Sequence, residues 1–157
     1  GIGVVLDALN RLTESVHYIK KAIEINTNEP DYWYVFAEIQ EKLGFIEEAA
    51  MAYQRVIELD YLDYDVWLDY SKLLHHGGYI QNSIDTLNDG ITKFPDVPEL
   101  YYRLAIVLLD KNLRKESLAV FEKAMEMDYS IHDDIFEYAP VLKNDIDILN
   151  LISTFNK

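Results

Sequence analysis

Apolar side chains recur along the chain at the spacing of an α-helix. In the segment 46–57 they fall three or four residues apart, on one face of a helical turn. The same face returns in the segments 12–23 and 80–91, with serine at some of the small positions. Each stripe predicts an amphipathic helix that buries one side. The apolar positions of the clearest stripe are Ile46, Ala49, Ala50, Tyr53, Val56 and Ile57.

These stripes belong to a longer pattern that repeats every 34 residues. A step of 34 residues from a large residue, a small residue or a glycine reaches a residue of similar size and polarity. A period of this length is the mark of stacked supersecondary units that bury a continuous core. The columns are Trp33, Trp67 and Tyr101; Phe36, Tyr70 and Leu104; Ala37, Ser71 and Ala105; Gly44, Gly78 and Asn112; and Tyr53, Leu87 and Phe121.

Each unit is predicted to contain two helices joined by a tight turn. Pro30 and Pro98 stand where the first helix of a unit begins, a position that needs no N–H donor. Gly44 and Gly78 stand between the helices, where a left-handed residue ends the first one. The small residues of the Ala37 column allow the two backbones to approach closely.

This set of columns resembles the tetratricopeptide repeat family across essentially the whole chain. The resemblance implies an all-α fold, an α-solenoid of antiparallel helix pairs that forms a right-handed superhelix. It predicts a single domain over residues 1–157. The expected units are 1–29, which is shortened at its N-terminal side, 30–63, 64–97, 98–131 and a shortened last unit, 132–157.

The pattern also makes predictions for both ends of the chain. The repeat places Gly3 in the small column, so residues 1–6 are expected to end a first helix and the sequence to be cut from a longer solenoid. A disordered or tag-derived stretch is the alternative. Pro140 falls inside a predicted helix, which should therefore kink or end near Ala139. Asn144 or Asp145 is expected to cap a final helix over 145–155, and the C-terminus to be natural.

The charge of the chain narrows the classes of partner. Lys and Arg total 14 and Asp and Glu total 28, which gives a net charge of −14. An acidic surface repels nucleic-acid backbones and anionic lipid. We therefore predict that the chain binds neither nucleic acid nor a membrane. No apolar run reaches the roughly 18 residues of a membrane helix. The absence of Cys fits a reducing compartment and a cytoplasmic location.

Catalytic chemistry has little support in the sequence. The adjacent histidines His75 and His76 point about 100° apart on a helix, so they are poorly placed to bind one metal ion. The four Asp of segment 60–69 lack the Gly and Glu that a calcium loop requires. The chain contains no Cys nucleophile, no glycine-rich phosphate loop and no GxSxG motif. We expect a protein that is not an enzyme and uses no metal or cofactor.

The resemblance implies that ligands bind the groove formed by the first helices of the units. An acidic column lies there beside an apolar and aromatic one, which favours a protein or peptide partner that is basic and partly apolar. The clamp with which some family members hold an acidic chaperone tail is replaced largely by acids. The predicted groove residues are Asp31, Tyr34, Glu38, Asp65, Leu68, Asp69, Lys72, Glu99, Tyr102, Arg103 and Ile106.

Other interpretations of the same surface stay open. The acids could serve only to keep a helical array in solution. The chain could be a structural element that assembles with itself, and the apolar remnant at residues 2–6 predicts association at this edge or fraying of it. RNA processing is a weaker alternative, because surfaces that bind RNA need Lys and Arg.

Overall fold

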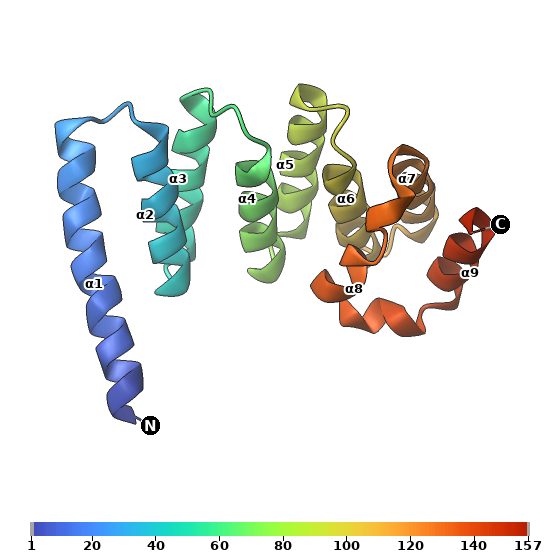
Figure 1. The fold of residues 1–157 in the computed structure, drawn as a ribbon, viewed down its shortest axis with the longest axis horizontal. Coiled ribbons are helices and arrows are strands. Elements are labelled where there is room, and N and C mark those ends of the chain that lie inside the picture. The colour runs from blue at the N-terminus through green and yellow to red at the C-terminus, as the bar shows by residue number, and fades with distance from the viewer. Residues whose placement is uncertain (1, 157) are drawn as a thin grey trace. The chain divides into compact units, whose positions relative to one another are not determined.

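The computed structural model describes the backbone of residues 2–156 and the side chains of residues 8–156. Over this range the chain forms helices joined by turns and no strand, so the all-α prediction is confirmed. Figure 1 shows the helices following one another along the chain. They are α1 (Ile2–Ile25), α2 (Pro30–Lys42), α3 (Ile46–Glu58), α4 (Asp65–His76), α5 (Ile80–Lys93), α6 (Pro98–Asp110), α7 (Arg114–Met127), η1 (Tyr129–Ile131), α8 (Asp134–Tyr138), η2 (Pro140–Asn144) and α9 (Ile146–Phe155).

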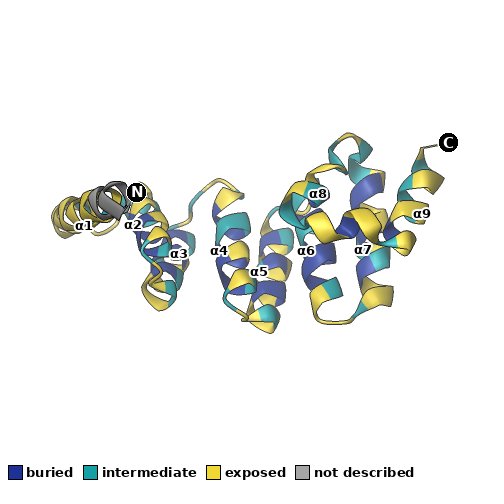
Figure 2. Cartoon of the chain, turned by 90° about the horizontal axis from the view of Figure 1, so that it is seen from below, coloured by how far each residue is buried: buried dark blue, intermediate teal, exposed yellow. Residues whose placement is uncertain are grey.

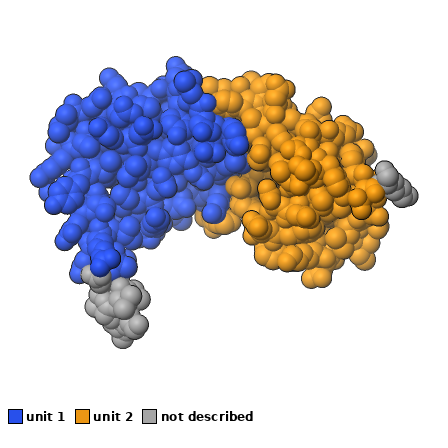
Figure 3. Space-filling view, in the orientation of Figure 1, with its two compact units in different colours: residues 1–73 blue, residues 74–157 orange. Residues whose placement is uncertain are grey.

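The chain divides into two compact units, which Figure 3 colours separately. Unit 1 covers residues 1–73 and contains α1, α2, α3 and most of α4. Unit 2 covers residues 74–157 and contains the last residues of α4 and all later helices. The functional surfaces described below each lie within one of these units.

Prolines begin helices and glycines follow their ends where the sequence predicts. Pro30 is in the first turn of α2, and the side chain of Glu29 accepts a hydrogen bond from the Asp31 amide at 3.3 Å. Gly44 and Gly78 have φ angles of +85° and +88°, in the left-handed region that glycine enters without steric cost. Asn112 occupies the same column with φ of +67°. The predicted turns between paired helices are therefore confirmed.

The N-terminal region differs from the prediction. We expected the end of one helix, then a turn, then the helix over 12–23, but residues 2–25 form the single helix α1 (Figure 1). The glycine of the turn column is replaced by Asn10, and neither Gly nor Pro occurs between Asp7 and Ile25. Nothing local therefore stops the helix. The surroundings of Gly3 and the side chains of the apolar remnant at residues 2–6 lie outside the described residues.

The core of unit 1 lies between paired helices, as the columns predict. Ala37 of α2 and Ala49 of α3 are both fully buried, and so the two backbones approach closely. Tyr53 fills the space beside them at 1% exposure. Figure 2 shows the buried residues concentrated on the faces that α2 and α3 turn toward each other.

The core of unit 2 repeats this arrangement between α6 and α7. Ala105 and Phe121 are each 1% exposed. The hydroxyl of buried Ser117 donates a hydrogen bond to the Ala105 carbonyl oxygen at 2.5 Å, which joins the two helices. Leu87 and Gly90 bury the matching face of α5.

Pro140 changes the path of the last repeat. Helix α8 ends at Tyr138, and the chain continues as the short 3-10 helix η2 from Pro140. The Asp145 side chain then caps α9, accepting a hydrogen bond from the Ile148 amide at 3.2 Å. The predicted break and cap are both confirmed. As a result Leu142 of η2 turns inward and joins the core that α6 and α7 form.

Candidate functional site

An acidic hollow of about 300 Å³ opens on the surface of unit 1. It lies where α2, the turn after α3 and the start of α4 meet, and we call it the acidic hollow. Four of its residues are carboxylic acids and two are tyrosines, with one exposed valine. It is lined by Asp31, Tyr34, Val35, Glu38, Tyr61, Asp65 and Asp69.

Tyr34 is the central aromatic residue of the acidic hollow. Its hydroxyl donates a hydrogen bond to the carboxylate of Asp69 on α4. Its ring meets the rings of Tyr53 and Tyr61 edge to face, with centroid distances of 5.8 and 5.4 Å, an arrangement that aromatic pairs favour. Burial, and then the neighbouring Asp69 carboxylate, raise the pKa of Tyr34 well above its ordinary value. The residue therefore stays neutral and fixed in place.

Hydrogen bonds and ring contacts of the neighbouring Tyr53 support Tyr34. The Tyr53 hydroxyl donates a hydrogen bond to Glu41 at 3.0 Å. The centroids of the Tyr53 and Tyr70 rings are 6.0 Å apart. The Gln54 amide nitrogen in turn donates to the Tyr70 hydroxyl at 2.7 Å. The aromatic wall of the hollow is thus continuous with the core of unit 1.

The carboxylates of the hollow interact unfavourably with one another. Burial, followed by the charge of Asp69, raises the pKa of Glu38, while Lys42 opposes the shift. The protein here disfavours the ionised acid, because like charges share a partly dehydrated site. A cation placed in the hollow would relieve this repulsion.

The structure brings together five of the predicted groove residues of unit 1. Asp31, Tyr34, Glu38, Asp65 and Asp69 line the acidic hollow. Two other predicted residues of α4, the half-buried Leu68 and the exposed Lys72, are not part of its lining.

The sequence analysis missed two lining residues of the hollow. Val35 is exposed on α2, and Tyr61 lies in the turn after α3, next to Asp60. The backbone of Asp60 has a φ angle of +58°, which Asp tolerates better than most residues. The 34-residue steps from Tyr61 reach Thr27 and Pro95, so no repeat column identifies this tyrosine.

In unit 2 two predicted groove residues are not on the surface. Tyr102 and Ile106 are each 4% exposed and pack in one cluster with Ile135 and Leu142. The physical reason is the last repeat, because Ile135 of α8 and Leu142 of η2 are buried in the same cluster. Glu99, near the start of α6, stays half-buried.

The remaining predicted residue of unit 2, Arg103, is held by the last repeat. Its guanidinium carbon lies 3.8 Å from the centre of the Tyr138 ring. The Tyr138 hydroxyl and His75 Nδ1 are 2.8 Å apart, and His75 Nε2 also contacts the carboxylate of Asp110. Burial, the largest cause, raises the pKa of Tyr138 to about 12. This cluster fastens α8 to α4 and α6, and it leaves Arg103 packed against an aromatic ring.

The described residues form neither a metal site nor a membrane-spanning helix. No group of three or more His, Cys, Asp or Glu side chains in this part of the chain is arranged to hold a metal ion. None of the helices described combines the length and the apolar character that crossing a membrane requires.

The sequence of this chain matches a known protein family and is similar to a known protein. The family model described as tetratricopeptide repeat matches residues 1–29, 30–61 and 98–130, which together make up more than half of the chain. A TPR repeat-containing protein of Methanocaldococcus jannaschii is 38% identical over 52 residues. That match covers 33% of this chain, and this chain spans only 15% of the length of that relative.

Solved structures share the fold at low sequence identity. MamA of Desulfovibrio magneticus matches 98% of this chain and 92% of its own, with a TM-score of 0.67 and 14% identity. YrrB, described as a TPR protein with an unusual peptide-binding site, matches 96% and 79%, with a TM-score of 0.66 and 17% identity. PilF of Pseudomonas aeruginosa matches 98% and 73%, with a TM-score of 0.65 and 15% identity. The repeat columns, the paired helices and the family match agree, and the chain belongs to the tetratricopeptide repeat family.

Proposed function

We propose that this chain is a non-catalytic protein-interaction scaffold whose acidic hollow binds a basic side chain of an extended partner segment. Family membership supports the scaffold role, since repeats of this family generally bind proteins or peptides without catalysing a reaction. The observation that carries the finer proposal is the composition of the hollow, in which four carboxylates surround the rings of Tyr34 and Tyr61.

The chemistry of the hollow suits a lysine or arginine side chain. A cation beside a tyrosine ring is attracted to the π face, and the carboxylates of Asp31, Asp65 and Asp69 add charge-assisted hydrogen bonds. A volume of about 300 Å³ is large enough to admit one lysine or arginine side chain. Burial and then the charge of Asp69 raise the pKa of Glu38, and binding of the cation would offset both effects.

The rest of the partner segment would extend over neighbouring groove residues. Within unit 1 these are Leu68 and Lys72 of α4. Tyr102 and Ile106 are left out of the proposal because they are buried. The net charge of −14 favours encounter with basic segments in general.

The test is a binding titration with a charged probe that carries no apolar side chain. A fluorescein-labelled peptide of four Gly-Arg repeats is titrated with the chain, and a peptide of four Gly-Glu repeats is the charge-reversed control. The paired substitution Asp31→Asn and Asp65→Asn should weaken binding of the arginine peptide about tenfold, which equals about 1.4 kcal/mol. Raising the salt concentration should also weaken it, because exposed charges are screened.

A matched variant separates the hollow from the overall charge. Glu47 and Glu48 lie in the first turn of α3, outside the hollow. Changing both to Gln removes the same number of charges and should leave the affinity almost unchanged. If both double variants weaken binding equally, the attraction is a property of the whole surface and the proposed site is wrong.

A further inference from the structure

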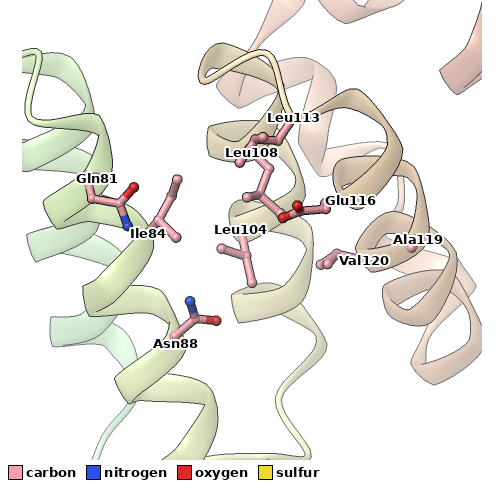
Figure 4. Close-up of a pocket in the computed structure, with 9 residues that line it drawn as sticks. All are labelled: Gln81, Ile84, Asn88, Leu104, Leu108, Leu113, Glu116, Ala119 and Val120. Carbon is pink, nitrogen blue, oxygen red and sulfur yellow. The ribbon is translucent and has the colours of Figure 1, made fainter.

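Unit 2 contains a second hollow, of about 420 Å³, that is chemically unlike the acidic one. It opens between α5 and α7, with side chains of α6 between them (Figure 4). We call it the apolar groove. Its residues are mostly aliphatic, with two amides on α5 and one acid on α7. They are Gln81, Ile84, Asn88, Leu104, Leu108, Leu113, Glu116, Ala119 and Val120.

The repeat register explains why space is left at this position. In unit 1 the equivalent residues of Asn88 and Leu104 are Gln54 and Tyr70. There the Gln54 amide nitrogen donates a hydrogen bond to the Tyr70 hydroxyl at 2.7 Å. In unit 2 the amide side chain is shorter by one methylene and the phenol is replaced by an isobutyl group. Neither substitute reaches as far, and the hollow results.

The apolar side of the groove is made of core residues. Ile84, Leu104 and Leu108 are each 6% exposed and belong to the core of unit 2. Such a surface gains free energy when an apolar side chain covers it, because little conformational entropy is lost by the wall.

The polar side of the groove specifies a charge. Glu116 is in the first turn of α7, and Figure 4 shows its side chain extending toward Leu104. Among the described residues that line the groove, Glu116 alone is charged. An apolar ligand that carries a cation at its edge would complement both features, whereas an acidic ligand would be repelled.

We propose that the apolar groove binds a segment of a partner protein in which a leucine-like side chain stands next to an arginine or lysine. The apolar side chain would enter the groove beside Leu113 and Val120 and reach the exposed edges of Ile84, Leu104 and Leu108. The cation would pair with Glu116. Gln81 and Asn88 would supply polar groups for the backbone of the segment. This second surface is independent of the acidic hollow, which contains no residue of unit 2.

The experiment follows methyl resonances of Ile84, Leu104 and Val120 by NMR in the full 157-residue chain. The probe is acetyl-Leu-Arg-Leu-Arg-amide, and the controls are acetyl-Leu-Glu-Leu-Glu-amide and acetyl-Gly-Arg-Gly-Arg-amide. The leucine–arginine peptide should shift these resonances with at least about fivefold higher affinity than either control. Equal affinity of the leucine–glutamate peptide would overturn the proposal.

Two pairs of variants give the test its specificity. Asn88→Trp should fill the groove and abolish the shifts, whereas Asn82→Trp, the same substitution on the same helix outside the lining, should leave them. Glu116→Gln should remove the preference for arginine over glutamate while leaving the core intact. Binding that persists in Asn88→Trp would refute the proposed site.

Two further outcomes distinguish this groove from other surfaces. The paired substitution Asp31→Asn and Asp65→Asn should leave these shifts unchanged, so the failure of one proposal does not imply the failure of the other. Methyl shifts that depend on protein concentration without any peptide would show that a second copy of the chain occupies the groove, and would overturn the proposed partner.

Discussion

Replacing Ala105 by leucine tests the close approach of α6 and α7. The Ala105 side chain is 1% exposed. The backbone carbonyl oxygen of Ala105 accepts a hydrogen bond from the Ser117 hydroxyl at 2.5 Å. Phe121 and Ala124 pack in the same cluster at 1% and 0% exposure. An isobutyl group has no space there unless the helices separate, and separation would stretch the hydrogen bond. Overpacking of this kind costs about 1–3 kcal/mol.

The loss is measurable as a change in the melting temperature. For a chain of this length each kcal/mol corresponds to about 2–4 °C, so we expect a decrease of about 2–12 °C by calorimetry or circular dichroism. Ala8→Leu is the matched control, because Ala8 is an exposed alanine on α1 and does not line the apolar groove. It should leave the melting temperature within a degree or so. If the two variants melt together, the packing described for α6 and α7 is wrong.

Two other predictions concern pH and a helix cap. Burial raises the folded-state pKa of Tyr34, Tyr53 and Tyr102 above the ordinary value of 10.0 and that of Tyr138 to about 12. The stability that these tyrosines contribute is complete below pH 10 and should fall as the pH rises from 10 toward 12. The melting temperature of Tyr34→Phe should therefore fall less steeply over this pH range than that of the unchanged protein. Asp145→Ala should destabilise α9 by about 1 kcal/mol in urea unfolding, because it removes the acceptor for the Ile148 amide, whereas Asp145→Asn should retain most of the cap. The Arg114 guanidinium lowers the pKa of Asp145, so this contribution should be lost as the pH falls through and below the ordinary value of 3.8; a stability that does not change between pH 6 and pH 2 would contradict that assignment.

The helix ends were predictable because single residues determine them. Proline at 30 and 98 starts a helix, and glycine at 44 and 78 supplies the positive φ that ends its predecessor. Pro140 stops α8 for the equally local reason that it lacks an amide proton and clashes with the preceding turn. Where the turn residue is Asn10, which also fits a helix interior, the local signal was too weak and the predicted turn was wrong.

The candidate site was only half predictable, because it depends on contacts outside the repeat. Helical register alone brings Asp31, Tyr34 and Glu38 to one face of α2. Tyr61 enters the hollow through a turn whose path depends on the left-handed Asp60, and the hydrogen bond from Tyr34 to Asp69 joins two different helices. A sequence pattern of period 34 contains no information on either contact.

The contrast between the units follows from the packing of the element that comes after each repeat helix. Tyr34 and Tyr102 occupy the same column of the repeat, so the sequence treats them alike. In unit 2 Ile135 of α8 and Leu142 of η2 join the buried cluster that contains Tyr102 and Ile106. In unit 1 Tyr34 keeps one side open and is held by Asp69 and Tyr53 instead. A repeat column therefore states which side chains can face a ligand, but the packing of the following element decides which of them do so.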